Sequence, residues 1–368
     1  MTQTSYSAVA LADGSIPIQE FELPEIGSND GLLKVEITGV CGSDWPYYQS
    51  YPSTKGPLIL GHETVGFVET AGARALEAWG AREGDLVALE EYLPCGHCSY
   101  CRGGSFRLCD ATDSLLGAGL RYGSTPVSVK PSLWGGYGQY QYLHPNTVLH
   151  KVPDGVSPRL ATLALPLGNG FEWTMFQGGT NLQTTVLIQG PGQQGLACVL
   201  AAKAAGAACI IVSGLARDRE RLDLAKALGA DCTINVEEED IFSTISDVTG
   251  GEMPNLIIDC SSGGAQTFLE GLHLVRKNGL VLVCGRKARP IPEFDTNILF
   301  KKNITVKGLR GHSYEAVEMA LSVLKSKAYP VERLCTHDFG LNEVRQALDA
   351  VSGNADYFPI HCTVSPRF

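Results

Sequence analysis

Two short stretches near the start of the chain contain residue types that bind zinc and move protons. The sequence Cys-Gly-Ser-Asp occupies 41–44, and Gly-His-Glu occupies 61–63. Thiolate, imidazole and carboxylate are ligands that zinc takes in proteins, and a zinc ion with an open position acts as a Lewis acid. A nearby hydroxyl could pass on the proton of a bound substrate. We therefore predict a catalytic site built from Cys41, Ser43, His62 and Glu63, with Cys41, His62 and Glu63 as metal ligands.

Four further cysteines have the spacing of a second, different zinc site. They follow the pattern Cys-x2-Cys-x2-Cys-x7-Cys within residues 95–109. Four thiolates fill a tetrahedral zinc shell, so no position is left for substrate. The alternative is buried or disulfide-bonded cysteines, but this close spacing strains disulfide geometry. The pattern predicts a structural zinc that orders a lobe with little core of its own. Its ligands would be Cys95, Cys98, Cys101 and Cys109.

A glycine-rich turn in the second half of the chain predicts dinucleotide binding. Residues 185–189 form an apolar run, residues 190–195 read Gly-Pro-Gly-Gln-Gln-Gly, and a helical pattern follows to residue 205. Between a buried strand and a helix, this motif brings backbone N–H groups close to a pyrophosphate. The residues expected to contact the cofactor are Gly190, Gly192, Gln193, Gln194, Gly195, Ser213, Arg217, Cys260, Ser261 and Gly285.

The elements that position these residues are of two kinds. Residues 1–90 alternate short β-type runs with Gly/Pro turns, which predicts a small β domain. From about residue 166, apolar runs alternate with amphipathic helical stretches, as in a doubly wound parallel sheet. A run at 360–364 could return as a strand to the first domain. The five strand candidates beyond 185–189 are 209–212, 233–236, 256–259, 280–283 and 304–306.

Composition narrows the possible partners and location. At 368 residues, the chain is long enough for two domains. Its net charge of -10 argues against binding to nucleic acid or to an anionic membrane surface. Neither a signal peptide nor a membrane-spanning run is recognisable. Closely spaced cysteines beside isolated ones fit a reducing compartment, so we expect a cytoplasmic protein.

Together these motifs, with the run Arg-Leu-x-Leu-Ala-x-x-Leu-Gly-Ala-Asp at 221–231, resemble the zinc-containing medium-chain alcohol and polyol dehydrogenases. The resemblance is to the branch that includes sorbitol and threonine dehydrogenases. It implies an α/β fold: a GroES-like β-barrel domain at 1–165, completed by 311–368, and a Rossmann domain at 166–310. It also implies an active site in a cleft, hydride transfer with NAD(P), a small alcohol or ketone substrate, and a homodimer or homotetramer. In such a site Ser43 takes the proton of the alcohol.

The chain departs from that family at two places near the catalytic site. Many members carry a proton-relay histidine five positions after the catalytic cysteine, where this chain has Pro46. The usual positions of the third zinc ligand hold Leu165 and Asn169, and an amide oxygen is a poor zinc ligand. Glu63 is therefore the expected third ligand, with Glu172 as a second candidate.

The cofactor-binding half departs at the end of its second strand. NAD-type members place an aspartate there, whereas this chain has Ser213-Gly214. Without that carboxylate, a 2′-phosphate is not repelled, and Arg217 or Arg219 could attract it. The sequence thus leans toward NADP, unless Asp218 binds the ribose instead.

The leading hypothesis is an enzyme that interconverts a secondary alcohol and a ketone. One alternative is a relative without catalytic zinc that reduces an activated C=C or C=N bond with NADPH. Another is a non-catalytic nucleotide-binding protein. The aromatic residues Trp45, Tyr47 and Tyr48 could line an apolar substrate pocket or anchor their loop.

Overall fold

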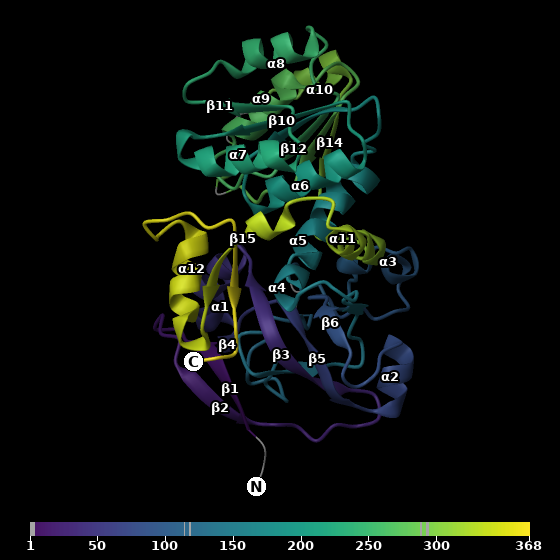
Figure 1. Cartoon of the computed structure of the whole chain (residues 1–368), viewed down its shortest axis with the longest axis vertical. Helices are drawn as coiled ribbons and strands as arrows, with labels where there is room; N and C mark the ends of the chain where they lie inside the picture. Colours follow the sequence, from purple (N-terminus) through teal and green to yellow (C-terminus); the bar gives the residue numbers. More distant parts are fainter. Residues whose placement is uncertain (1–3, 114, 118, 288, 292–293) are drawn as a thin grey trace. The chain divides into compact units, whose positions relative to one another are not determined.

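The computed structural model describes residues 4–113, 115–117, 119–287, 289–291 and 294–368 (Figure 1). It divides into two compact units. The first comprises residues 1–165, 321–326 and 334–368, and the second comprises 166–320 and 327–333. We predicted that 311–368 would complete the first domain; in this division, 311–320 and 327–333 cluster with the second unit instead. No helix in the described part of the chain is long and apolar enough to cross a membrane.

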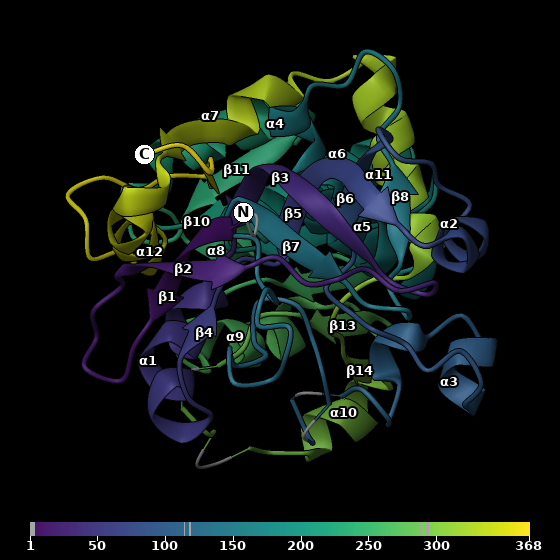
Figure 2. The ribbon, with the colours of Figure 1, turned by 90° about the horizontal axis from the view of Figure 1, so that it is seen from below.

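The first unit is built on one large sheet whose strands run in the order β15-β16-β3-β5-β6-β8, with β7 also paired to β3. The described pairings leave this sheet open, so the predicted closed barrel is not seen among them. A smaller sheet pairs strands in the order β2-β1-β4, and Figure 2 shows it beside helix α1, Asp44–Thr54. The strand bounds are β1 Thr4–Ala10, β2 Ile18–Glu22, β3 Gly31–Val40, β4 Leu58–Ile59, β5 Glu63–Ala71, β6 Leu86–Leu89, β7 Tyr140–Leu143, β8 Leu149–Lys151, β15 Cys335–Phe339 and β16 His361–Val364.

Helices in the first unit are mostly short. α1 carries aromatic residues into the core, where Tyr47 and Tyr48 are buried. The C-terminal strand β16 pairs antiparallel with β3, which confirms the predicted return of the tail to the first unit. The helix bounds are α1 Asp44–Thr54, α2 Ala73–Trp79, α3 Ser99–Arg102, α4 Pro158–Ala161 and α12 Val344–Ser352.

The second unit contains a six-stranded parallel sheet in the order β11-β10-β9-β12-β13-β14. This is the doubly wound order of a dinucleotide-binding fold, and the strand order reverses between β9 and β12. Central strands are buried on both faces, as Val186, Leu187 and Ile188 of β9 illustrate. The strand bounds are β9 Thr185–Gln189, β10 Cys209–Gly214, β11 Cys232–Asn235, β12 Leu256–Asp259, β13 Leu280–Val283 and β14 Thr305–Gly308.

Helices cover both faces of this parallel sheet. Figure 1 shows α6 and α7 on one side and α8, α9 and α10 on the other. α5 continues directly into a π-helical segment at Glu172–Gln177. The helix bounds are α5 Ala164–Phe171, α6 Gln193–Ala204, α7 Arg219–Leu228, α8 Ile241–Thr249, α9 Gln266–Leu274, α10 Asn297–Lys302 and α11 Tyr314–Ser326.

Candidate zinc and dinucleotide sites

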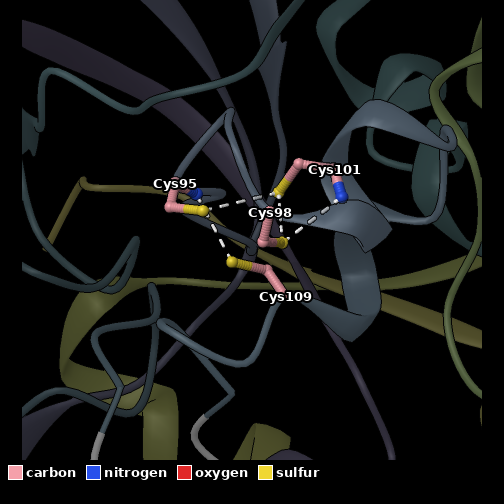
Figure 3. A group of neighbouring side chains, drawn as sticks. All are labelled: Cys95, Cys98, Cys101 and Cys109. Carbon is pink, nitrogen blue, oxygen red and sulfur yellow. Dashed lines mark hydrogen bonds between the residues drawn. The ribbon is translucent and has the colours of Figure 1, made fainter.

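The four cysteines of the lobe point their sulfur atoms toward one another (Figure 3). The Sγ atoms of Cys98 and Cys101 are 3.5 Å apart, and those of Cys95 and Cys101 are 4.0 Å apart. Ligands on a tetrahedral zinc with Zn–S bonds of about 2.3 Å are separated by about 3.8 Å. All four ligand atoms lie within 4.8 Å of one another, and all four cysteines are free thiols. The geometry fits a closed zinc site.

Backbone donors in the lobe are already arranged for thiolates. Cys101 N donates to Cys98 Sγ at 3.4 Å, and Cys95 N donates to Cys109 Sγ at 3.4 Å. Burial alone opposes ionisation of Cys109, but hydrogen bonds from Cys95 and Thr112 lower the pKa of its thiol to about 6. A thiolate at Cys109 is stabilised by a nearby cation, so the lobe favours a bound metal ion.

The second cluster is formed where β3 and β5 run side by side. Cys41 follows the end of β3, and His62 directly precedes β5, whose first residue is Glu63. Gly39 of β3 is paired with Glu63 of β5, so the two chain segments meet at this point. The ligand atoms of Cys41, His62 and Glu63 lie within 4.8 Å of one another. The structure therefore brings together the three residues predicted to bind the catalytic metal.

A glycine is required immediately before His62. Gly61 has φ of +88°, and a Cβ atom there would lie 2.7 Å from Cδ1 of Tyr137. The tight packing of Tyr137 against this turn fixes the backbone from which His62 projects. The positive φ explains why the motif begins with glycine.

Asp44 fixes the orientation of the imidazole of His62. Its Oδ1 lies 3.1 Å from His62 Nδ1, and its Oδ2 accepts hydrogen bonds from Cys41 N at 3.1 Å and Tyr137 Oη at 2.8 Å. With Nδ1 held by a carboxylate, Nε2 is the nitrogen left to bind a metal. Ser43 Oγ lies 3.5 Å from this Nε2 and 3.2 Å from Cys41 Sγ. The predicted proton-carrying hydroxyl is thus adjacent to two of the candidate ligands.

Glu63 carries a buried oxygen with no hydrogen-bond partner. That atom, Oε2, lies 3.9 Å from His361 Nδ1, and His361 Nε2 pairs with Thr162 Oγ1 at 2.8 Å. Burial, with a smaller effect of Arg159, lowers the pKa of His361 to about 3, so its imidazole is neutral. The neutral imidazole of His361 therefore gives the Glu63 carboxylate no positive charge to pair with. An unpartnered buried carboxylate oxygen is the feature expected where a metal ion binds.

The electrostatics of the cluster also favour a bound cation. Burial, with smaller contributions from Asp44 and Glu91, outweighs the opposing effect of His62 and raises the pKa of Glu63 to about 8. Burial disfavours a charged imidazole, but Asp44 and Glu91 raise the pKa of His62 well above its usual value. The site therefore gathers more negative charge than the protein itself neutralises, and the donor set fits zinc.

The other candidates for the third ligand have different surroundings. Leu165 is a buried apolar residue in α5. Asn169 Oδ1 pairs with His312 Nδ1 at 3.0 Å. Glu172 accepts hydrogen bonds from Ser313 Oγ at 2.7 Å and Gln177 Nε2 at 2.8 Å. Glu63, in contrast, lies in the same cluster as Cys41 and His62.

Sequence reasoning missed a buried ion pair beside His62. Glu91 Oε2 lies 3.6 Å from His62 Nε2, and the Arg121 guanidinium forms a short contact with the same carboxylate. Arg121 Nη1 also donates to Tyr47 Oη at 3.0 Å. The only sequence signal was the unusual Glu-Glu pair that ends the apolar run at 86–89.

Of the aromatic residues after Ser43, the two tyrosines are hydrogen-bonded within the first unit. Tyr48 Oη donates to the Gly14 carbonyl at 2.6 Å and accepts from Arg345 at 2.7 Å. Tyr47 is tied to Arg121. These contacts anchor α1.

The residues predicted to contact the cofactor gather at the carboxyl edge of the parallel sheet. Gly190 follows β9, Cys260 and Ser261 follow β12, and Gly285 follows β13 closely. Cys260 N donates to the Gln189 carbonyl at 3.0 Å, and a Cβ on Gly285 would lie 2.1 Å from the Ser261 carbonyl oxygen. The α6 helix begins at Gln193, directly after the glycine turn. This edge, at the reversal of the strand order, fits a dinucleotide.

The second strand of the dinucleotide fold ends without a free carboxylate. Ser213 and Gly214 are the last residues of β10. Asp218 Oδ2 accepts from Leu215 N at 3.1 Å, and Asp218 Oδ1 pairs with Arg221 at 3.1 Å. Arg217 is exposed, whereas Asp218 is buried. The carboxylate of Asp218 is therefore already bonded to groups of its own turn and the helix that follows.

Lys287 was also missed by sequence reasoning. Its ammonium lies 2.7 Å from the buried Asp259 carboxylate and donates to the Ser261 carbonyl at 2.8 Å. It ties together the loops that follow β12 and β13. The pairing joins residues 28 positions apart, and no local motif marks it.

Comparison with known proteins agrees with this geometry. A family model described as alcohol dehydrogenase GroES-like domain matches residues 27–154, and one described as zinc-binding dehydrogenase matches residues 195–326. A probable alcohol dehydrogenase of Mycobacterium tuberculosis is 35% identical over 353 residues, covering 95% of both chains. A sorbitol dehydrogenase of Halalkalibacterium halodurans is 32% identical over 344 residues, covering 93% of this chain and 94% of that protein.

A solved structure extends the similarity to the whole fold. The crystal structure of an alcohol dehydrogenase from Thermotoga maritima superposes with a TM-score of 0.86 at 26% identity, covering 99% of this chain and 100% of that chain. These matches confirm the resemblance predicted from the motifs. The chain belongs to the zinc-containing medium-chain alcohol dehydrogenase superfamily and is an oxidoreductase that acts on alcohols with zinc and a nicotinamide cofactor.

Proposed function

We propose that the Cys41–His62–Glu63 cluster is the catalytic zinc site of a dehydrogenase that interconverts a secondary alcohol and a ketone. The observation that carries this proposal is the clustering of the ligand atoms of Cys41, His62 and Glu63 within 4.8 Å of one another, with a buried oxygen of Glu63 left without a hydrogen-bond partner. Relatives named L-threonine 3-dehydrogenase support a secondary hydroxyl as the reacting group, because the hydroxyl on carbon 3 of threonine is secondary. When bound, the zinc would lower the pKa of the substrate hydroxyl, and the nicotinamide would accept the hydride.

The side chains of the cluster have separate roles in this proposal. Cys41, His62 and Glu63 hold the metal, and Asp44 keeps His62 Nε2 directed toward it. Ser43 Oγ, next to both Cys41 Sγ and His62 Nε2, accepts the substrate proton. Pro46 has no group that could carry the proton onward, so the proton leaves Ser43 toward water or the cofactor ribose.

We further propose that the cofactor is NADP. Ser213 stands where an acid would repel a 2′-phosphate, and Asp218 is engaged with Leu215 N and Arg221. Arg217 is exposed on the same turn and offers a positive charge. In steady-state kinetics, the wild type is expected to favour NADP over NAD at least tenfold in kcat/KM, and Arg217→Ala to lower that ratio. A wild type that favours NAD would contradict the assignment.

Two zinc ions per chain are expected, one in each cluster, in a cytoplasmic protein whose closely spaced thiols require reducing conditions. Metal analysis of purified protein tests the sites directly. Cys41→Ala should retain one zinc and lose alcohol oxidation, whereas Cys98→Ala should lose the other zinc. A wild type with a single zinc that survives Cys41→Ala but is lost in Cys98→Ala would overturn the catalytic site.

The exposed edge of the parallel sheet suits self-association of the chain. β14 lies at one edge of the parallel sheet, and all four of its residues are exposed. Phe300 of the preceding helix α10 is 87% exposed. An exposed edge strand offers unpaired backbone groups to another strand. We propose that a second copy of the chain pairs there in a homodimer, alone or within a homotetramer.

A further inference from the structure

Glu91 approaches the one nitrogen of His62 that can bind the metal. Asp44 occupies Nδ1, and Glu91 Oε2 lies 3.6 Å from Nε2. Nitrogen and oxygen ligands on one tetrahedral zinc, with bonds of about 2.0–2.1 Å, are separated by about 3.3 Å. Glu91 thus lies at nearly the distance from Nε2 that a fellow ligand would have. Cys41, His62 and Glu63 form the compact cluster, and Glu91 reaches this cluster at His62.

The position of Glu91 is set by a buried cation. Glu91 and Arg121 are each 7% exposed, and their side chains are in direct contact. Arg121 is itself fixed by Tyr47 Oη at 3.0 Å and by the Tyr92 ring, whose centroid lies 5.1 Å from its Cζ. A buried carboxylate needs such a partner when no metal holds it. Arg121 therefore holds Glu91 in place whether or not its carboxylate is bound to zinc.

Glu91 and Arg121 also connect the two chain segments that enter and leave the cysteine lobe, which we call the neck of the lobe. Glu91 lies four residues before Cys95, the first cysteine of the lobe, and Arg121 lies twelve residues after Cys109, the last. At this neck, Tyr92 and Arg121 form an antiparallel bridge, and Tyr122 N donates to the Glu91 carbonyl at 3.1 Å. The backbone that carries Glu91 is thus held in place by an isolated bridge between the segments that enter and leave the lobe.

We propose that Glu91 is a further ligand of the catalytic zinc, filling its fourth position when no substrate is bound. Substrate then displaces the carboxylate, which remains paired with Arg121. This inference rests on the proposed catalytic zinc, and it assigns to the neck of the cysteine lobe the task of positioning a ligand. The Cys41 thiolate, Glu63 and Glu91 carry three negative charges, which a divalent metal and the Arg121 guanidinium match, while Asp44 pairs with His62 Nδ1.

Cobalt substitution at the catalytic site tests the proposal without relying on turnover. Co(II) affinity is measured by competition with a chelator, and the visible absorption bands report the ligands. Glu91→Gln should weaken Co(II) binding at this site at least tenfold and change the spectrum of the substrate-free protein. Addition of a substrate alcohol should make the wild-type and variant spectra converge, because residue 91 then contributes no ligand in either protein.

Glu90→Gln is the matched control. Glu90 is the neighbouring buried carboxylate, but it pairs with His150 Nε2 at 3.2 Å instead of with His62. This variant should leave Co(II) affinity and spectrum unchanged; an equal loss in Glu90→Gln would overturn the proposal, because the loss would then reflect disturbance of the strand. If Glu91→Gln does not fold, Glu91→Asp, which keeps the charge but shortens the side chain, should change the spectrum in the same test.

Failure of this inference is distinguishable from failure of the proposed function. A wild type that binds no metal at Cys41, His62 and Glu63 would refute both. A wild type that binds Co(II) there, with Glu91→Gln equal to it in affinity and spectrum, would refute only the role of Glu91.

Discussion

Asp44 touches no predicted substrate or metal position, yet it decides which nitrogen of His62 is available. Its two oxygens hold His62 Nδ1, Cys41 N and Tyr137 Oη. A carboxylate behind a ligating imidazole orients the ring and strengthens the imidazole as a ligand, and its loss typically weakens metal binding by about 10- to 100-fold.

We therefore predict that Asp44→Asn lowers zinc affinity at the catalytic site by about 10- to 100-fold. Chelator competition followed by metal analysis measures this change. Asp30→Asn is the control, because Asp30 also accepts a tyrosine hydroxyl, from Tyr142 at 2.9 Å, but contacts none of the cluster. Unchanged zinc affinity in Asp44→Asn would show that His62 is oriented by other contacts.

Ser43 is predicted to act on the proton and not on the metal. Ser43→Ala should lower kcat by about 100-fold or more, the usual scale of general acid–base catalysis. The variant should keep two zinc ions per chain, and Ser43→Thr should recover part of the rate because it restores a hydroxyl. A rate equal to that of the wild type in Ser43→Ala would remove Ser43 from the proton path.

Site residues could be predicted from the sequence where the members of a site lie close together in the chain. The spacing of cysteines at 95–109 predicted a group of sulfur atoms that the structure brings within 4.8 Å. The pair Glu91–Arg121 could not be predicted in this way. The two residues are 30 positions apart, and their contact depends on how the lobe folds back on itself. Charged residues are usually exposed, so sequence alone gives no reason to bury them together.

At the scale of elements, the glycine motif at 190–195, where the turn leads into α6, contains two glycines with different tasks. A Cβ on Gly195 would lie 1.9 Å from the Gly190 carbonyl oxygen, so the turn itself excludes a side chain there. A Cβ on Gly192 would meet nothing within 4 Å. Any need for glycine at position 192 must therefore come from the ligand and not from the fold.

Gly195→Ala is predicted to destabilise the protein in the absence of cofactor, because the turn must open to admit the methyl group. Gly192→Ala should leave the melting temperature unchanged but weaken NAD(P) binding about tenfold or more, as expected if the backbone there approaches a pyrophosphate. Differential scanning fluorimetry and cofactor titration separate the two effects. Full cofactor affinity in Gly192→Ala would place the pyrophosphate elsewhere.

Elements in the two halves of the chain were predictable to different degrees. All six strands of the parallel sheet were predicted, and the central strands β9, β10 and β12 are the clearest, because strands buried on both faces have continuous hydrophobic sequences. In the first unit, the strands were recognisable but their pairing was not. The β3–β5 ladder contains register shifts near Leu33 and Ile37, and such irregularities have no clear sequence signature.

At the scale of the whole molecule, the exposed edge of the parallel sheet is the feature that bears on assembly. β14 pairs on one side with β13, and its Val306 is 36% exposed. Natural proteins usually protect such edges with charge or cover, because an open edge invites another strand. Lys307 is the only charged residue in β14. The strand therefore has limited protection unless a partner covers it.

We predict that the wild type is a homo-oligomer and that Val306→Lys shifts it toward smaller species. The substitution places like charges from two copies close together at the proposed strand pair, where they repel each other. Light scattering coupled to size-exclusion chromatography measures the mass. Leu182→Lys is the control, because Leu182 is 80% exposed in the same unit but lies outside the sheet. If Val306→Lys keeps the wild-type mass, or if the wild type is a monomer, β14 is not the site of self-association.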